Sequence, residues 1–252
     1  MQGMKNGFLT ILIIFLIAMS YLQTAPAGEL PDVSAWFRHV QGSGKIVQEQ
    51  RNVPELAGVQ LDGGGTLYLR QGEKQRVEVA TDDNLLSLLR TRVDGDGVLH
   101  VGFEAGSVNP TQLEIFVTAR QIRSLKIAGS GKVLGQGKIG GEDLKLIIAG
   151  SGNMALDLDL KQLDSDISGS GNLALSGRAD TQRVRISGSG SVNALELESQ
   201  SAKIDVSGSG DCNVRVRDEL QAHISGSGKV QYQGQPRLDT HVSGSGKILS
   251  IP

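Results

Sequence analysis

Ile-Ser-Gly-Ser-Gly-Asn-Leu at residues 167–173 is followed by Ile-Ser-Gly-Ser-Gly-Ser-Val at residues 186–192, and these two stretches decide the fold of the 252-residue chain. Each stretch has an apolar residue, a small residue, a Gly-Ser-Gly triplet and, two positions later, another apolar residue. Alternating apolar positions on both sides of a glycine turn are typical of two β-strands joined at a tight corner. A corner that recurs after 19 residues indicates one coil of a solenoid.

The triplet forms an array of seven, at successive spacings of 21, 19, 19, 20, 18 and 18 residues. Glycines allow positive φ and close approach of backbones at each corner, and neighbouring coils stack at the strand spacing of about 4.8 Å. We therefore predict an all-β, right-handed parallel β-helix over residues 126–252. Its structural corner residues are Gly129, Gly131, Gly150, Gly152, Gly169, Gly171, Gly188, Gly190, Gly208, Gly210, Gly226, Gly228, Gly244 and Gly246.

Residues 40–125 contain a weaker form of the same pattern. Gly42-Ser43-Gly44 is followed 21 residues later by Gly63-Gly64-Gly65, which predicts irregular coils of the same solenoid. Further strands are expected at 77–79, 98–101 and 113–117, with a turn at 94–97 and one helical turn within 84–90. No linker composition separates the two parts, so residues 28–252 are expected to form a single domain.

Residues 1–27 belong to a different chemical class. Lys5 precedes an apolar run from Phe8 to Met19, and Ala25-Pro26-Ala27 supplies small residues of the kind found at signal-peptide cleavage sites. We expect a secretory signal that is cleaved after Ala27, and export to the periplasm or the cell surface. The alternative is an uncleaved N-terminal membrane anchor, although a spanning helix needs about 20 apolar residues.

The array and the strands before it resemble a bacterial family of unknown function, the auto-transporter adhesin head GIN domain. The resemblance covers roughly residues 40–250 and is carried by Gly42-Ser43-Gly44, by residues 59–65, 77–86 and 98–101, and by the repeated Ile-Ser-Gly-Ser-Gly units. It implies an exported β-helical fold and brings no known catalytic residues.

One outward column is the best candidate for a functional surface. Strand alternation places it three positions before each triplet, at Lys126, Ile147, Asp166, Arg185, Asp205, His223 and His241. Opposite charges stacked on consecutive coils are typical of cross-strand pairs that stabilise a sheet. The alternative is a substrate-binding or acid/base stripe, because β-helical polysaccharide enzymes use clustered carboxylates in an open groove.

The other reactive side chains predict no catalytic, cofactor or metal site. His223 and His241 lack a nearby third ligand. Cys212, the single cysteine, falls in the apolar column and is expected to be buried. Asn153 and Asn172 follow their triplets on adjacent coils and predict an amide ladder.

We therefore expect a non-enzymatic, exported cell-envelope protein that acts as a structural or adhesin-like interaction module. Its partner would be an envelope protein or a glycan, and not nucleic acid, because a formal net charge of −2 with mixed charges provides no concentrated basic face. The last coil, residues 242–251, also predicts self-association, since uncovered strand edges pair readily. A β-helical polysaccharide-processing enzyme and a membrane-anchored envelope sensor remain open as alternatives.

Overall fold

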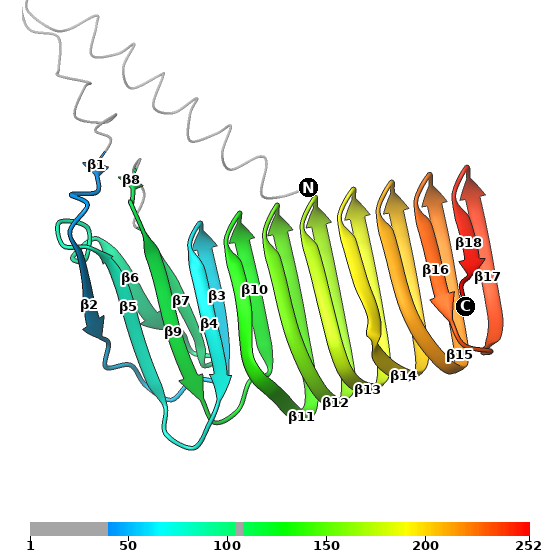
Figure 1. The fold of residues 1–252 in the computed structure, drawn as a ribbon, viewed down its shortest axis with the longest axis horizontal. Helices are drawn as coiled ribbons and strands as arrows, with labels where there is room; N and C mark the ends of the chain where they lie inside the picture. The colour runs from blue at the N-terminus through cyan, green and yellow to red at the C-terminus, as the bar shows by residue number, and fades with distance from the viewer. Residues whose placement is uncertain (1–39, 104–107) are drawn as a thin grey trace, which may run out of the picture. The chain divides into compact units, whose positions relative to one another are not determined.

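The computed structural model describes residues 40–103 and 108–252, in which every regular element is a β-strand (Figure 1). The expected signal segment, residues 1–27, lies outside the described residues. Within the described part, no helix is long and apolar enough to cross a membrane. The strands are β1 (Val40–Gln41), β2 (Ile46–Gln50), β3 (Gly58–Gly63), β4 (Thr66–Gln71), β5 (Arg76–Asp82), β6 (Leu89–Val93), β7 (Val98–Phe103), β8 (Val108–Asn109), β9 (Leu113–Ala119), β10 (Ser124–Gly129), β11 (Lys132–Gly150), β12 (Asn153–Gly169), β13 (Asn172–Gly188), β14 (Ser191–Gly208), β15 (Asp211–Gly226), β16 (Lys229–Gln233), β17 (Arg237–Gly244) and β18 (Lys247–Ser250).

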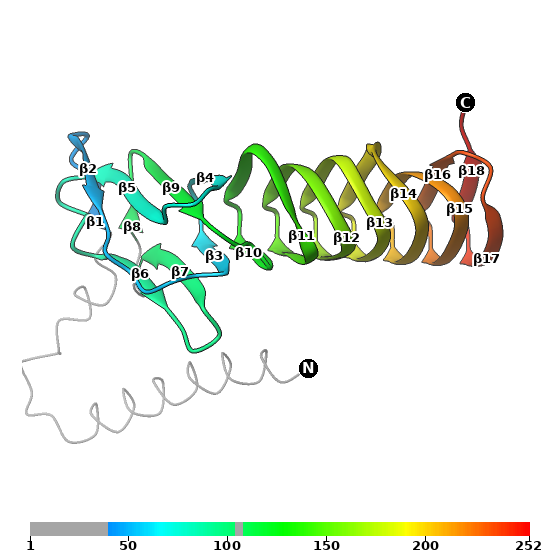
Figure 2. The same cartoon turned by 90° about the horizontal axis from the view of Figure 1, so that it is seen from below.

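Strands β11 to β15 each make most of one coil. Each strand leaves a Gly-Ser-Gly corner, runs along one side, bends at the far end and returns along the other side (Figure 2). In β12, burial alternates from Met154 to Leu160 and resumes with the opposite parity at Leu163, because Lys161 and Gln162 are both exposed at the bend. We call the half that leaves the corner the outgoing face and the half that enters the next corner the return face. In β12 they are residues 153–160 and 162–169.

The coils pair in parallel and in register. Ile148 pairs with Ile167 and Ile167 with Ile186, so the residue before each corner lies over its counterpart in the next coil. The corners stack by the same rule: the Ser189 N–H donates to the Gly169 carbonyl at 2.9 Å and the Ser191 N–H donates to the Gly171 carbonyl at 3.0 Å. The predicted parallel β-helix with Gly-Ser-Gly corners is confirmed.

The two glycine positions of each corner have no space for a larger residue. Gly188 has a φ of +123°, and a Cβ there would lie 2.5 Å from the carbonyl oxygen of Gly169 in the preceding coil. The second glycine, Gly190, meets a different obstacle, since its Cβ would lie 2.6 Å from Cγ2 of Ile167. Both distances are far below van der Waals contact. The triplet is therefore required by the stacking of coils as well as by the turn.

Unequal coil lengths are absorbed on one side of the solenoid. The pairing register shifts between Leu134 and Lys138 of β11, between Ala174 and Ser176 of β13, and within 194–201 of β14. All of these irregularities lie on the outgoing face or at the bend. The return face pairs without interruption from 162 to 169 and at the matching positions of the following coils up to β15.

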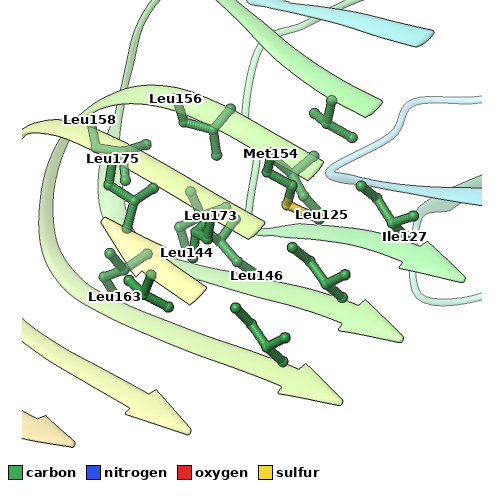
Figure 3. Packing of buried hydrophobic residues seen from close by; sticks show 14 of the residues in the cluster. Leu125, Ile127, Leu144, Leu146, Met154, Leu156, Leu158, Leu163, Leu173 and Leu175 are labelled. Carbon is green, nitrogen blue, oxygen red and sulfur yellow. The ribbon is translucent and has the colours of Figure 1, made fainter. Parts of the chain in front are cut away.

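The core is the space between the two faces (Figure 3). Leu144 and Leu146 from a return face pack with Met154, Leu156 and Leu158 from the next outgoing face, and all are buried. Burial of such a side chain contributes about 1.5–3 kcal/mol. A coil cannot bury these residues alone, so the apolar column is continuous only when coils are stacked.

The solenoid continues into the N-terminal part, in an order that differs from the chain order. Strands β3 and β4, joined at Gly63-Gly64-Gly65, form a coil under β10 and β11, with Leu61 opposite Ile127 and Leu67 opposite Val133. Strands β7 and β9 pair in parallel with β3 and β4 on the other side. The stack then changes direction, because β6, β5 and β2 pair antiparallel with β7, β9 and β5 respectively.

Two expectations for this part are wrong. Gly42-Ser43-Gly44 is not a stacked corner one coil before Gly63, because the strand that follows it, β2, runs antiparallel to β5. Residues 83–88 form consecutive turns and no helix, with the Leu85 N–H bonded to the Asp82 carbonyl and the Leu88 N–H bonded to the Leu85 carbonyl, both at 2.9 Å. The expected turn at 94–97 is present and joins the antiparallel strands β6 and β7.

Candidate functional site

The expected outward column is present on the return face. Asp166 pairs with Arg185, Arg185 with Asp205, Asp205 with His223 and His223 with His241, each in the next coil. The inward neighbours of Asp166, Arg185, Asp205 and His223 are buried, whereas the column itself is partly or fully exposed. The parity of the strands therefore brings side chains that are 18 to 20 residues apart in sequence into one line.

Members of this column are paired with one another. The guanidinium of Arg185 donates to both carboxylate oxygens of Asp166, at 2.5 and 3.0 Å. His223 Nδ1 lies 3.4 Å from Asp205 Oδ1, and the rings of His223 and His241 have centroids 6.3 Å apart. The hydrogen bond from Arg185 lowers the pKa of the Asp166 carboxyl, despite partial burial, so this carboxyl is ionised at neutral pH.

A second column runs beside the first and borders an open hollow. Asp164, Arg183, Lys203 and Gln221 pair in sequence on consecutive coils, and Arg183 Nη1 lies 3.5 Å from Asp164 Oδ1. The hollow, with a volume of about 320 Å³, is lined by these side chains and by neighbouring residues of the same strands. Both signs of charge are interspersed along it.

The outgoing face has a different chemistry. Asn172 Nδ2 donates to Asn153 Oδ1 at 2.8 Å, and the Ser191 hydroxyl donates to Asn172 Oδ1 at 2.7 Å. The expected amide ladder is thus present and continues into a serine. Beside it, Ala155 and Ala174 are exposed and border an open hollow of about 370 Å³. This part of the outgoing face carries amides and small residues next to the carboxylates of Asp157 and Glu196, which also line the hollow.

Asp166 and Asp205 on the return face do not have the arrangement of a glycosidase acid/base pair. Asp166 and Asp205 are two coils apart, about 9.5 Å from the strand spacing, which is near the upper limit for the carboxylates of inverting glycosidases. Arg185 occupies the position between them. A general acid also needs a raised pKa, whereas the pKa of Asp166 is lowered. Among residues 40–103 and 108–252, no three His, Cys, Asp or Glu side chains are grouped as metal ligands.

The cysteine and the aromatic side chains contribute to packing. Cys212 is fully buried between Val192 and Val230 in the apolar column, and burial raises the pKa of its thiol to about 12. Tyr68 and Phe116 stack with ring centroids 5.0 Å apart and planes inclined by 10°. One face of each ring is therefore covered by the other ring. Trp36 and Phe37 lie outside the described residues.

Sequence reasoning overlooked a polar clamp at the N-terminal end. The buried carboxylate of Asp82 accepts hydrogen bonds from the Gly44 N–H at 2.7 Å and the Thr111 N–H at 2.8 Å. Next to it, the Ser43 hydroxyl donates to Asp83 Oδ1 at 2.7 Å. Desolvation alone would raise the pKa of Asp82, but the backbone donors outweigh it and the pKa is lowered. Two adjacent aspartates at the end of a strand, Asp82 as the last residue of β5 and Asp83 after it, were the available signal.

Comparison with known families identifies the array. Residues 55–236 match the model of the family described as "Putative auto-transporter adhesin, head GIN domain". The chain belongs to this family. The matched range contains six of the seven corners as well as β3 to β9, so the head GIN fold comprises the regular solenoid together with its antiparallel end.

Solved structures share this head GIN fold at low sequence identity. A structure described as a putative adhesin from Bacteroides fragilis matches with a TM-score of 0.78 at 23% identity, over 84% of this chain and 100% of that chain. A second, described as a putative lipid binding protein from Parabacteroides distasonis, has a TM-score of 0.73 at 22% identity, over 85% and 100%. A third, described as a putative adhesin from Parabacteroides merdae, has a TM-score of 0.70 at 22% identity, over 85% and 99%. No functionally curated protein matches the chain.

Proposed function

We propose that this head GIN protein is exported to the cell envelope and acts there as a non-enzymatic, adhesin-like interaction module. The observation that carries the proposal is the pair of extended faces on which outward side chains are held in straight columns. The return face displays fixed ion pairs, such as Asp166–Arg185, and the outgoing face displays the Asn153–Asn172–Ser191 ladder. Repetitive extended surfaces are used by solenoid proteins to bind partners.

The electrostatics of these faces favour binding over catalysis. Several charged groups on the return face are paired with a neighbour in the next coil, as Asp166 is with Arg185 and Asp164 is with Arg183. The described geometry offers no enclosed cavity with convergent reactive groups, which is the usual setting of an active site. The partner proposed is an envelope protein or a glycan that contacts several coils at once, since no single coil carries a distinctive constellation.

The first experiment tests location and processing. Intact-mass measurement of the protein from the envelope fraction is expected to show a chain that begins at Gly28, because Ala25-Pro26-Ala27 supplies the cleavage site. A chain that retains Met1 in that fraction would support the anchored sensor instead.

The second experiment tests the faces. The exported protein is immobilised and exposed to envelope extract, together with two matched variants that place a glutamate on one face or the other. Ala174→Glu alters the outgoing face and Lys203→Glu alters the return face, and both positions are exposed. We expect one variant to lose the captured partner and the other to retain it. Capture that neither variant affects, or turnover of a polysaccharide that Asp166→Asn abolishes, would contradict the proposal.

A further inference from the structure

The last coil exposes residues at positions that are buried in every preceding coil. Leu238 and Val242 of β17 pair with Leu220 and Ile224 of β15, which are 0% and 1% exposed, yet Leu238 is 46% and Val242 is 38% exposed. Leu249 of β18 is 42% exposed as well, at an outward position opposite Gln231. Three of the five exposed large hydrophobic side chains in the described part of the chain therefore lie in this coil.

The two ends of the stack differ in how their edge strands are protected. At the N-terminal end, β2 is an antiparallel strand that carries Gln48, Glu49 and Gln50, and charged or polar side chains of this kind discourage pairing with another chain. Strand β17 pairs with β15 alone among the described residues. Its outward side presents strand backbone together with the apolar side chains above, which is a template for a further strand.

The sequence of β17 is complementary to itself when reversed about Thr240. Arg-Leu-Asp-Thr-His-Val-Ser, residues 237–243, can lie antiparallel to a second copy with Thr240 opposite the partner's Thr240. Leu238 then faces the partner's Val242, and Asp239 faces the partner's His241. The apolar pairs fall on the inward side and the Asp–His pairs on the outward side, so strand parity is preserved.

We propose that two copies of this protein associate through antiparallel pairing of their β17 strands about a two-fold axis at Thr240. A closed two-fold contact of this kind is isologous, so each favourable pair occurs twice. Cross-strand apolar, Thr–Thr and opposite-charge pairs all stabilise a sheet. The outward column Asp205, His223, His241 would continue into the partner's Asp239. This inference does not depend on the proposed function.

Sedimentation velocity of the exported protein and three variants tests the pairing of Asp239 with the partner's His241. The wild-type protein is expected to be a dimer at micromolar concentration. His241→Asp places two aspartates opposite each other at two symmetric contacts and is expected to raise the dissociation constant at least tenfold. The swap Asp239→His with His241→Asp restores the Asp–His pairs and is expected to restore the dimer. Lys203→Asp, a charge change on an inner coil, is the control that leaves the dimer intact.

Cross-linking tests the register. In Thr240→Cys the two introduced thiols meet at the two-fold axis, with Cβ atoms about 4.5–5.5 Å apart, and mild oxidation is expected to give a covalent dimer. Leu238→Cys is the matched control, because four residues along the paired strands separate the two copies of this thiol by roughly 13 Å. Cys212 is fully buried and does not compete. A monomeric wild-type protein, failure of the charge swap to rescue His241→Asp, or equal cross-linking at 238 and 240 would overturn the proposal.

Discussion

Replacement of Gly188 by alanine tests whether the stacked corners hold the solenoid together. At this residue φ is +123° and an added Cβ would lie 2.5 Å from the Gly169 carbonyl oxygen. Positive φ costs a residue with a Cβ about 1–2 kcal/mol, and overpacking against a backbone that cannot move without separating two coils costs about 1–3 kcal/mol. The expected loss is therefore about 2–4 kcal/mol when partial relaxation is allowed for. In a unit of this size, each kcal/mol lowers the melting temperature by about 2–4 °C, so a drop of about 4–16 °C is expected.

Two controls separate the corner from its position in the stack. Ser189 is exposed, so Ser189→Ala is expected to change stability by less than about 0.5 kcal/mol. Gly244 has nearly the same φ, +122°, but belongs to the last corner, where a displaced coil leaves the remaining stack intact. Gly244→Ala should therefore lower the unfolding midpoint less than Gly188→Ala.

Thermal and urea unfolding followed by far-UV circular dichroism measures this order. Midpoints are the quantity to compare, because repeat arrays can depart from two-state unfolding. Gly188→Ala, Ser189→Ala and Gly244→Ala could all have the same unfolding midpoint as the wild-type protein within error. In that case the triplet is a loose turn and the reasoning from coil contact is refuted.

Two further predictions concern buried groups. Cys212→Val should lower the free energy of unfolding by less than about 1.5 kcal/mol, because it nearly conserves volume at a fully buried site. Native Cys212 should resist thiol reagents. Fast labelling would contradict its burial. Asp82 has a lowered pKa in the folded state, so its ionised form stabilises the protein above the ordinary carboxyl pKa of about 4, and this contribution is lost as the pH falls through the folded value. The melting temperature of Asp82→Asn should therefore lie below that of the wild type at pH 7, and the difference should shrink at pH 3; an equal difference at both pH values would show that charge is not the cause.

The regular coils could be predicted from sequence because their signal is repeated and local. A period that recurs with Ile or Val at the same offset specifies parity, so it also specifies which residues share a column. The line from Asp166 to His241 follows from that parity alone. Cross-strand pairing along this line was expected, but which of its two neighbours each residue pairs with, such as Arg185 with Asp166 and Asp205 with His223, depends on side-chain rotamers that no spacing specifies.

The N-terminal part could not be predicted to the same extent, for a physical reason. Alternation of apolar residues is the same in parallel and antiparallel strands, so β5 and β6 look like further coils. Strands β3 and β4 also precede β7 and β9 in the chain, but in the stack β3 lies between β7 and β10, and β4 lies between β9 and β11. Gly42-Ser43-Gly44 repeats the letters of a corner, yet its backbone N–H groups are bonded to the side chains of Asp82 and Asn84. Which groups a glycine turn bonds to is decided by the tertiary structure, and the spacing of residues in the sequence does not show it.

Register shifts are confined to the outgoing face and the bend, so the sequences of such repeats can change in length only there. An inserted or deleted residue there is absorbed as a bulge, as β11, β13 and β14 already show. The same change between a bend and the next corner would move every apolar side chain of that half-coil to the solvent side. Drift in repeat length is therefore expected to accumulate along one flank only. The return face keeps the same residue spacing in every coil. A partner that binds the return face could therefore be retained while coil lengths change.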